Sequence, residues 1–203
     1  MKLVLKLTIL VLSIALYSCK NEDASFNDYK YANEEQVVSC GDLDTKLYNE
    51  ALNTFEADIL SFYKNKKTNI KSTYNTFLRD IVYEKIAYQD MVSPHTMKVF
   101  EALRKKPELW AGTELNYNAP IYKCLTDNFM AKDFSTTVNS LIETNSMRSD
   151  ILLPPLQKRI KNIDKDKYLA TFIALNMYYS QLVNIDPSLV TEKPVVQEAN
   201  AAK

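Results

Sequence analysis

The sequence predicts an all-α protein, built as a single irregular bundle of about six to seven helices. Only two glycines occur in 203 residues, and apolar residues recur at steps of three and four over most of the chain. Such steps place apolar side chains on one face of a helix, whereas the alternation with a period of two that is typical of strands is hard to find. No repeat at a fixed period indicates a solenoid.

The first two helices are predicted from about residue 42 to 64 and from about residue 69 to 91. Asp42 and Asp44 suit the N-terminus of the first helix. The apolar face of that helix consists of Leu47, Tyr48, Ala51, Leu52, Phe55, Ile59, Phe62 and Tyr63. Because only residues 65–68 link the two helices, we expect an antiparallel hairpin.

The third, fourth and fifth helices are bounded by capping residues and prolines. Ser93 is a suitable N-cap with Pro94 at the first helical position, and this helix should end near Pro107. The segment from Trp110 to Ala119 is predicted to be irregular or a single turn. Pro120 then opens the fourth helix, and residues 135–144 form a short fifth one.

The last two helices differ strongly in character. Ser149 or Asp150 caps the sixth, and the Pro154-Pro155 pair must lie in its first turn or kink it. The seventh runs from about residue 164 or 165 to 185 and is the most apolar of all. It has little polar surface, so we place it at the centre of the bundle.

The first 18 residues have the features of an export signal. Two basic residues, Lys2 and Lys6, precede an apolar run over residues 7–16, and no acidic residue occurs before Cys19. This run is shorter than the roughly 20 residues that a helix needs to cross a bilayer. We therefore predict that residues 1–18 are a signal peptide and take no part in the fold.

The sequence Leu16-Tyr17-Ser18-Cys19 resembles the lipobox of bacterial lipoprotein precursors, with an aliphatic residue at −3, a small one at −1 and the cysteine to be modified. The resemblance implies cleavage before Cys19 and a lipid anchor on its thiol. Several acyl chains bind a membrane far more strongly than a single one. The alternatives are an ordinary secretory signal cut near Ser18 and a buried apolar helix.

The residues after Cys19 carry further targeting information. Lys20-Asn21-Glu22-Asp23 is similar to the Lys-plus-acidic tract that routes lipoproteins to the cell surface in Bacteroidota. This resemblance implies an outer-membrane protein on the periplasmic or cell-surface face, although any solvated tether is also charged. We predict a flexible tether over 19–39, a helical domain over 40–185 and a disordered tail over 186–203.

Net charge excludes one large class of partners. The chain has 25 basic and 25 acidic residues, and removal of residues 1–18 takes away Lys2 and Lys6 but no acid, so 23 basic residues remain and the net charge becomes −2. Nucleic-acid affinity depends on a basic excess that this protein lacks. We therefore expect no nucleic-acid partner.

Two cysteines remain beside Cys19, namely Cys40 and Cys124. An oxidising periplasm or cell surface could join them in a disulfide, which would close a loop of about 85 residues and pin the N-terminal segment to the domain. The alternative is one buried thiol and one exposed thiol.

Few residues suggest catalysis or metal binding. His95 is the single histidine, and we expect it at the surface or as a capping residue. Glu-x-x-His pairs, Cys-x-x-Cys-His, glycine-rich phosphate loops and His-Glu-x-x-His are absent, so no metal or cofactor is predicted. The long helices also carry carboxylates, which usually lie on a solvated face: Glu50, Glu56, Asp58, Asp80 and Glu84.

Two other groups of polar side chains have alternative interpretations. Asn176 lies inside the most apolar helix and is the best candidate for a buried polar group, which we interpret as a hydrogen-bonded core amide. Tyr117, Tyr122, Tyr178 and Tyr179 could line a groove, but in a helical bundle most tyrosines are packing residues.

No domain family is recognised in residues 40–185. The sequence therefore favours a non-enzymatic, membrane-anchored domain that acts through binding or assembly with an envelope partner. A carrier of a small apolar ligand in a cavity between helices is the second hypothesis, and an unrecognised enzyme is the third.

Overall fold

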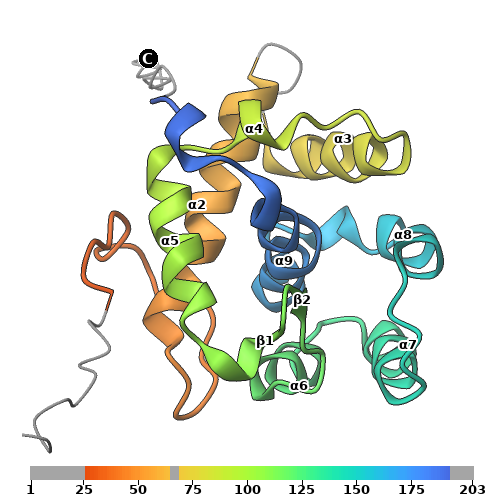
Figure 1. Cartoon of the computed structure of the whole chain (residues 1–203). Coiled ribbons are helices and arrows are strands. Elements are labelled where there is room, and N and C mark those ends of the chain that lie inside the picture. Colours follow the sequence, from red (N-terminus) through yellow and green to blue (C-terminus); the bar gives the residue numbers. More distant parts are fainter. Residues whose placement is uncertain (1–25, 65–68, 193–203) are drawn as a thin grey trace, which may run out of the picture.

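The computed structural model describes residues 26–64 and 69–192, and over these residues the protein is all-α (Figure 1). The predicted signal peptide, Cys19 and the tail from residue 193 onward lie outside the described residues. The α-helices are α2 (Thr45–Tyr63), α3 (Ile70–Val82), α4 (Tyr88–Met91), α5 (Pro94–Arg104), α6 (Pro120–Asp127), α7 (Lys132–Glu143), α8 (Ser149–Gln157) and α9 (Lys167–Ile173).

The predicted central helix is confirmed, although its geometry changes along its length. α9 continues into η3 (Ala174–Tyr178), which is π-helical, and then into η4 (Tyr179–Asn184), which is a 3₁₀-helix. Every residue from Leu169 to Tyr179 is buried. Asp166 caps the start of α9 by accepting a hydrogen bond from the Leu169 amide at 3.1 Å.

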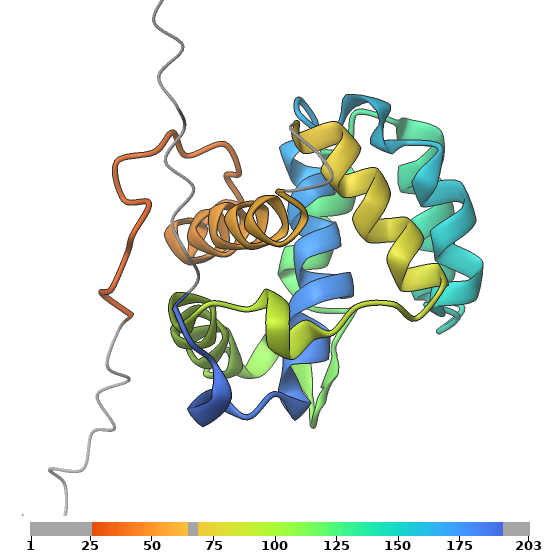
Figure 2. The same cartoon turned by 90° about the horizontal axis from the view of Figure 1, so that it is seen from above.

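The other helices surround this central one. α2 and α5 lie side by side along one flank, and α6 packs against α9. α3, α7 and α8 occupy the opposite flank in both views (Figures 1 and 2). The core therefore lies between two groups of helices, with α9 and η3 in the middle.

The predicted antiparallel hairpin of the first two helices is wrong, because α3 runs across α2 instead of back along it (Figure 1). Phe55 of α2 packs edge-on against Tyr74 and Phe77 of α3, with ring centroids 5.6 and 5.2 Å apart. The other side of α3 contacts α8. Because α3 crosses α2, this one short helix packs against both α2 and α8. The length of the loop between α2 and α3 does not indicate this packing.

The predicted second helix also ends earlier than residue 91. The backbone turns into the left-handed region at Glu84, with φ +52°, and the Lys85 amide donates to the Asp80 carbonyl oxygen at 2.8 Å. This is a Schellman motif, which normally uses glycine. Because no glycine marks this position, the predicted helix extends too far, and its last residues form the separate helix α4.

Two further segments differ from prediction. Strands β1 (Trp110–Ala111) and β2 (Glu114–Leu115) form an antiparallel pair, joined through Gly112 at φ +70°, where an irregular segment or single turn was expected. In α8, Pro154 and Pro155 lie inside the helix and past its first turn. Burial of Leu152, Leu153 and Leu156 stabilises the helix. This gain offsets the free energy lost with the backbone hydrogen bonds that the two prolines cannot donate.

The segment before α2, residues 26–40, is called the arm here. It has little regular structure, as predicted for a tether, but it is packed against the domain. Val38 is fully buried, and the Asn49 carboxamide accepts from the Val37 and Val38 amides and donates to the Val38 carbonyl oxygen, all at 2.7 to 3.1 Å. Val37 and Val38 thus belong to the folded unit, and this end of the predicted tether is not a free spacer.

The described part of the predicted disordered tail is also structured. η5 (Pro187–Leu189) is a 3₁₀ turn, in which Asp186 accepts from the Ser188 amide at 2.9 Å. The Gln89 side chain donates to the Asp186 carbonyl oxygen at 3.2 Å and so holds this turn beside α4. None of the helices over 26–64 and 69–192 is both long and apolar enough to cross a bilayer.

Candidate functional site

One face of α2 carries a polar stripe that is buried inside the domain. Glu50, Thr54 and Asp58 follow one another at four-residue spacing, which aligns them on the same side of the helix, and we call them the acidic stripe. Their exposed fractions are 3%, 2% and 5%. The expectation of a solvated face is therefore wrong for Glu50 and Asp58. It also fails for Asp80, which is buried on α3.

Glu50 holds the arm and α5 together. Its carboxylate accepts from the backbone amides of Lys30 at 2.7 Å and Tyr31 at 3.0 Å, and it pairs with His95 Nε2 at 2.6 Å. His95 lies in the first turn of α5 and is only 13% exposed, so the prediction of a surface or capping histidine is wrong. The only histidine of the chain is instead one half of a nearly buried pair.

Asp58 makes a second link, from α2 to α5 and η3. Its Oδ2 atom accepts from the Thr96 hydroxyl and from the Tyr178 hydroxyl, the latter at 2.6 Å. Thr96 belongs to the capping box of α5, in which the Thr96 amide donates to the Ser93 hydroxyl at 3.2 Å. A carboxylate beside the N-terminus of a helix is favoured by the helix dipole.

Burial shifts the pKa values of Asp58, Tyr178 and Tyr31. Loss of solvent raises the pKa of Asp58, and the hydrogen bonds from Thr96 and Tyr178 oppose that rise only in part. Burial and the nearby Asp58 charge raise the pKa of Tyr178 well above its usual value. Burial also raises the pKa of Tyr31 to about 12. Both phenols consequently stay protonated at neutral pH, and the Tyr178 hydroxyl donates to Asp58.

The chemistry of the acidic stripe is that of a structural junction. The Glu50 and Asp58 oxygens that face the arm, α5 and η3 are already engaged by donors of the protein itself. Such partners allow carboxylates to be buried, since an unpaired buried charge would cost several kcal/mol. Among the residues that the structure describes, no group of three or more His, Cys, Asp or Glu side chains could hold a metal ion.

This junction predicts a measurable loosening of the arm. Glu50→Ala should increase amide hydrogen exchange at Lys30 and Tyr31 by about thirtyfold, because losing a buried charged acceptor costs about 2 kcal/mol. Glu35→Ala, at an exposed position of the arm, is the matched control and should leave exchange unchanged. Equal exchange in the two variants would show that Glu50 does not hold the arm.

A hollow opens at the surface beside this junction, between the arm, α5 and η5. Its volume is about 490 Å³, and it is lined by Phe26, Asp28, Pro94, Met97, Lys98, Glu101 and Pro187. Lys98 donates to Asp28 at 2.7 Å across its rim. This ion pair lowers the pKa of Asp28 and raises that of Lys98. Most of the lining is apolar, so the hollow suits an apolar occupant.

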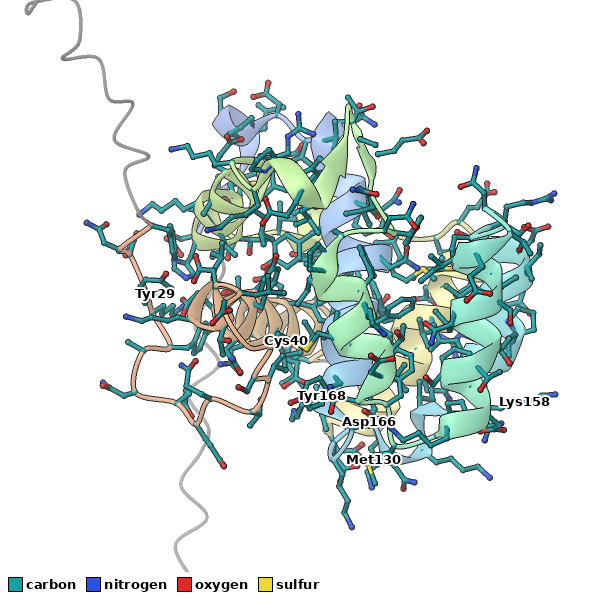
Figure 3. The ribbon with its side chains drawn as sticks, turned by 90° about the horizontal axis from the view of Figure 1, so that it is seen from below. Tyr29, Cys40, Met130, Lys158, Asp166 and Tyr168 are labelled. Atoms are coloured by element: carbon teal, nitrogen blue, oxygen red, sulfur yellow. A yellow bond between two sulfur atoms is a disulfide. The ribbon has the colours of Figure 1, made fainter. Side chains whose placement is uncertain are left out.

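The two remaining cysteines are joined in the structure. Cys40 at the end of the arm and Cys124 in α6 form a disulfide with Cα atoms 5.7 Å apart. Figure 3 shows Cys40 near Tyr168, whose hydroxyl donates to the Ser39 carbonyl oxygen at 3.3 Å. The arm is thus fixed to the domain through Glu50, Asn49 and the disulfide, and also through the Asp28–Lys98 ion pair and the hydrogen bond from Tyr168 to Ser39.

The candidate tyrosine groove is not formed. Tyr122, Tyr178 and Tyr179 are fully buried, as expected for packing residues. Tyr117 is half-buried and donates its hydroxyl proton to Asn176, whose amide is buried as predicted. Sequence reasoning missed the importance of Glu50, His95 and Asp58. Their alignment with the N-terminus of α5 depends on tertiary packing, although the four-residue spacing of polar residues on an apolar helix was a visible signal.

Comparisons with protein-family models, with curated proteins and with solved structures find no match to this chain. Function therefore has to be inferred from the residues and geometry described above.

Proposed function

We propose that the protein is a lipid-anchored envelope protein, held on the outer membrane through Cys19, whose helical domain acts by non-catalytic binding or assembly. The observation that carries this proposal is Leu16-Tyr17-Ser18-Cys19 placed directly after a basic and apolar export signal. The Lys20-Asn21-Glu22-Asp23 tract favours the outer membrane as its destination.

Two features of the fold support this function. The Cys40–Cys124 disulfide suits the periplasm or cell surface, where disulfides persist, more than a reducing cytosol. The most enzyme-like residues, Glu50, His95 and Asp58, bond to one another or to neighbouring helices and the arm, which favours a structural role for them. An envelope partner would accordingly meet the domain surface.

A carrier of a small apolar ligand is the second candidate function. The hollow of about 490 Å³ has the size of a ligand pocket, although it is open to solvent and lies at the surface. Native mass spectrometry of the protein released gently from membranes separates the two functions. A retained apolar molecule of one defined mass would favour the carrier, and a ligand-free protein would favour the binding or assembly role.

Replacement of the proposed lipid acceptor tests the anchor. We expect wild-type protein to fractionate with membranes and to have an intact mass that corresponds to a chain starting at lipid-modified Cys19. Cys19→Ala should lose both properties, because the thiol that forms the thioether is gone. The double variant Cys40→Ser with Cys124→Ser is the matched control and should keep the lipid. A wild-type protein that is soluble and carries no lipid would refute the anchor.

A further inference from the structure

The link between the proposed anchor and the folded domain is short. Because the arm is packed, only residues 20–25 separate Cys19 from Phe26, the first described residue. Seven Cα–Cα steps can span at most about 25 Å, whatever conformation they adopt. A domain of this size is about 40 Å across. If Cys19 carries lipid, as proposed above, Phe26 has to stay closer to the bilayer than one domain diameter.

The arm fixes where this link joins the domain. The ring of Phe26 lies 4.8 Å from that of Tyr29 and 6.4 Å from that of His95 in α5. The ion pair between Asp28 and Lys98 ties the same part of the arm to the outer side of α5. α7 and α8 lie on the opposite side of the domain in both views (Figures 1 and 2). The anchor therefore leaves from the α5 side.

The α5 side also carries the apolar surface that a bilayer contact requires. Phe26, Pro94 and Pro187 line the hollow, and Leu189 of the adjoining η5 is 65% exposed. Asp28 and Lys98 neutralise each other at the rim, and Glu101 adds a further acidic group. This balance gives no attraction to anionic headgroups, so the apolar residues have to supply the contact.

We infer that the face formed by Phe26, Pro94, Pro187 and Leu189 rests on the lipid surface that holds Cys19. The link length prevents the far side of the domain from reaching that surface, because Phe26 would then have to stand about 40 Å away from it. Figure 3 shows the exposed Lys158, at the end of α8, on the opposite side of the domain from Tyr29 of the arm. In the inferred orientation this side points away from the membrane. An envelope partner would meet the domain there.

Site-specific fluorescence quenching on the full, lipid-bearing chain tests this orientation. Glu101→Cys places a reporter at the rim of the hollow, and Lys158→Cys places a matched reporter on the opposite side. Both residues are exposed, and the lipid on Cys19 together with the Cys40–Cys124 disulfide leaves only the new thiol to react with a maleimide dye. The labelled proteins are placed in phosphatidylcholine vesicles that contain a lipid with a spin-labelled headgroup.

We expect quenching of the Glu101→Cys dye to be several-fold stronger than quenching of the Lys158→Cys dye. The difference should persist at high salt, because apolar contacts are not screened. The intact mass of the same samples separates two failures. Lipid-bearing protein with equal or reversed quenching would overturn the orientation alone, whereas absence of the lipid would overturn the anchor and the orientation together.

Discussion

Replacing Cys40 and Cys124 together by serine should lower the free energy of unfolding by about 4 kcal/mol. The disulfide closes a loop with a sequence separation of 84 residues, and the chain-entropy model gives long loops the largest stabilisation. Domains of this kind are stable by only about 5–15 kcal/mol, so the loss is a large share of the total. Urea denaturation of the wild type and the double variant, followed by circular dichroism, measures it directly.

Reduction offers a check that needs no substitution. A thiol reductant should shift the urea midpoint of the wild type toward that of the double variant, and it should leave the double variant unchanged. Cys19→Ser is the matched control, because it removes a cysteine but keeps the Cys40–Cys124 bridge. Identical midpoints for the wild type with and without reductant would show that the bridge does not contribute to stability.

Asp58→Ala should destabilise the domain by about 3 kcal/mol, because it leaves the buried hydroxyls of Thr96 and Tyr178 without their acceptor. Asp58→Asn should be much milder. Both hydroxyls donate to the same carboxylate oxygen, and a carboxamide oxygen at that position can accept both. Urea midpoints of the two variants at neutral pH decide this point. Equal losses would show that the hydrogen bonds are not what Asp58 contributes.

The pH dependence of stability gives a second test of Asp58. Its pKa in the folded state lies above the ordinary value of 3.8, so the folded chain holds this proton over a pH range where the unfolded chain has lost it. The contribution of Asp58 to the free energy of unfolding is therefore fully present below pH 3.8, and it falls as the pH rises toward the folded-state pKa. Wild type should lose stability relative to Asp58→Asn over this interval.

An exposed carboxylate supplies the control for that measurement. The pKa of Asp28 is lowered by its hydrogen bond with Lys98, so stability from Asp28 is present above its unfolded pKa and is lost as the pH falls. Asp28→Asn should therefore change the pH profile in the opposite direction and only slightly, because the pair is exposed. A profile for Asp58→Asn that parallels the wild type would contradict burial of an ionisable Asp58.

Local sequence signals located most helices because capping and apolar periodicity act within a few residues. Ser93 and Pro94 marked the start of α5, and Pro120 marked the start of α6. The apolar run of α9 placed it at the centre of the bundle, since such a helix has no polar face to show to water. Where the local signal was missing, as at Glu84, the end of the helix was misplaced.

The candidate site was harder to predict because its residues become partners only after the helices meet. Nothing near Glu50 or His95 in the sequence indicates the other, and they are 45 residues apart. The general expectation that helix carboxylates face water holds for helices with a solvated polar side. The acidic side of α2 fails it because the arm and α5 cover it.

The sequence alone determined the helical class and the central position of α9, because these depend on composition and on patterns within about twenty residues. It is also the sole basis of the proposal that the chain is exported and anchored. Only the tertiary structure decided that the arm is part of the domain and that Glu50 and Asp58 are buried. It also set the crossing of α2 by α3. Each of these depends on which surfaces meet in space, and segments far apart in the chain supply those surfaces.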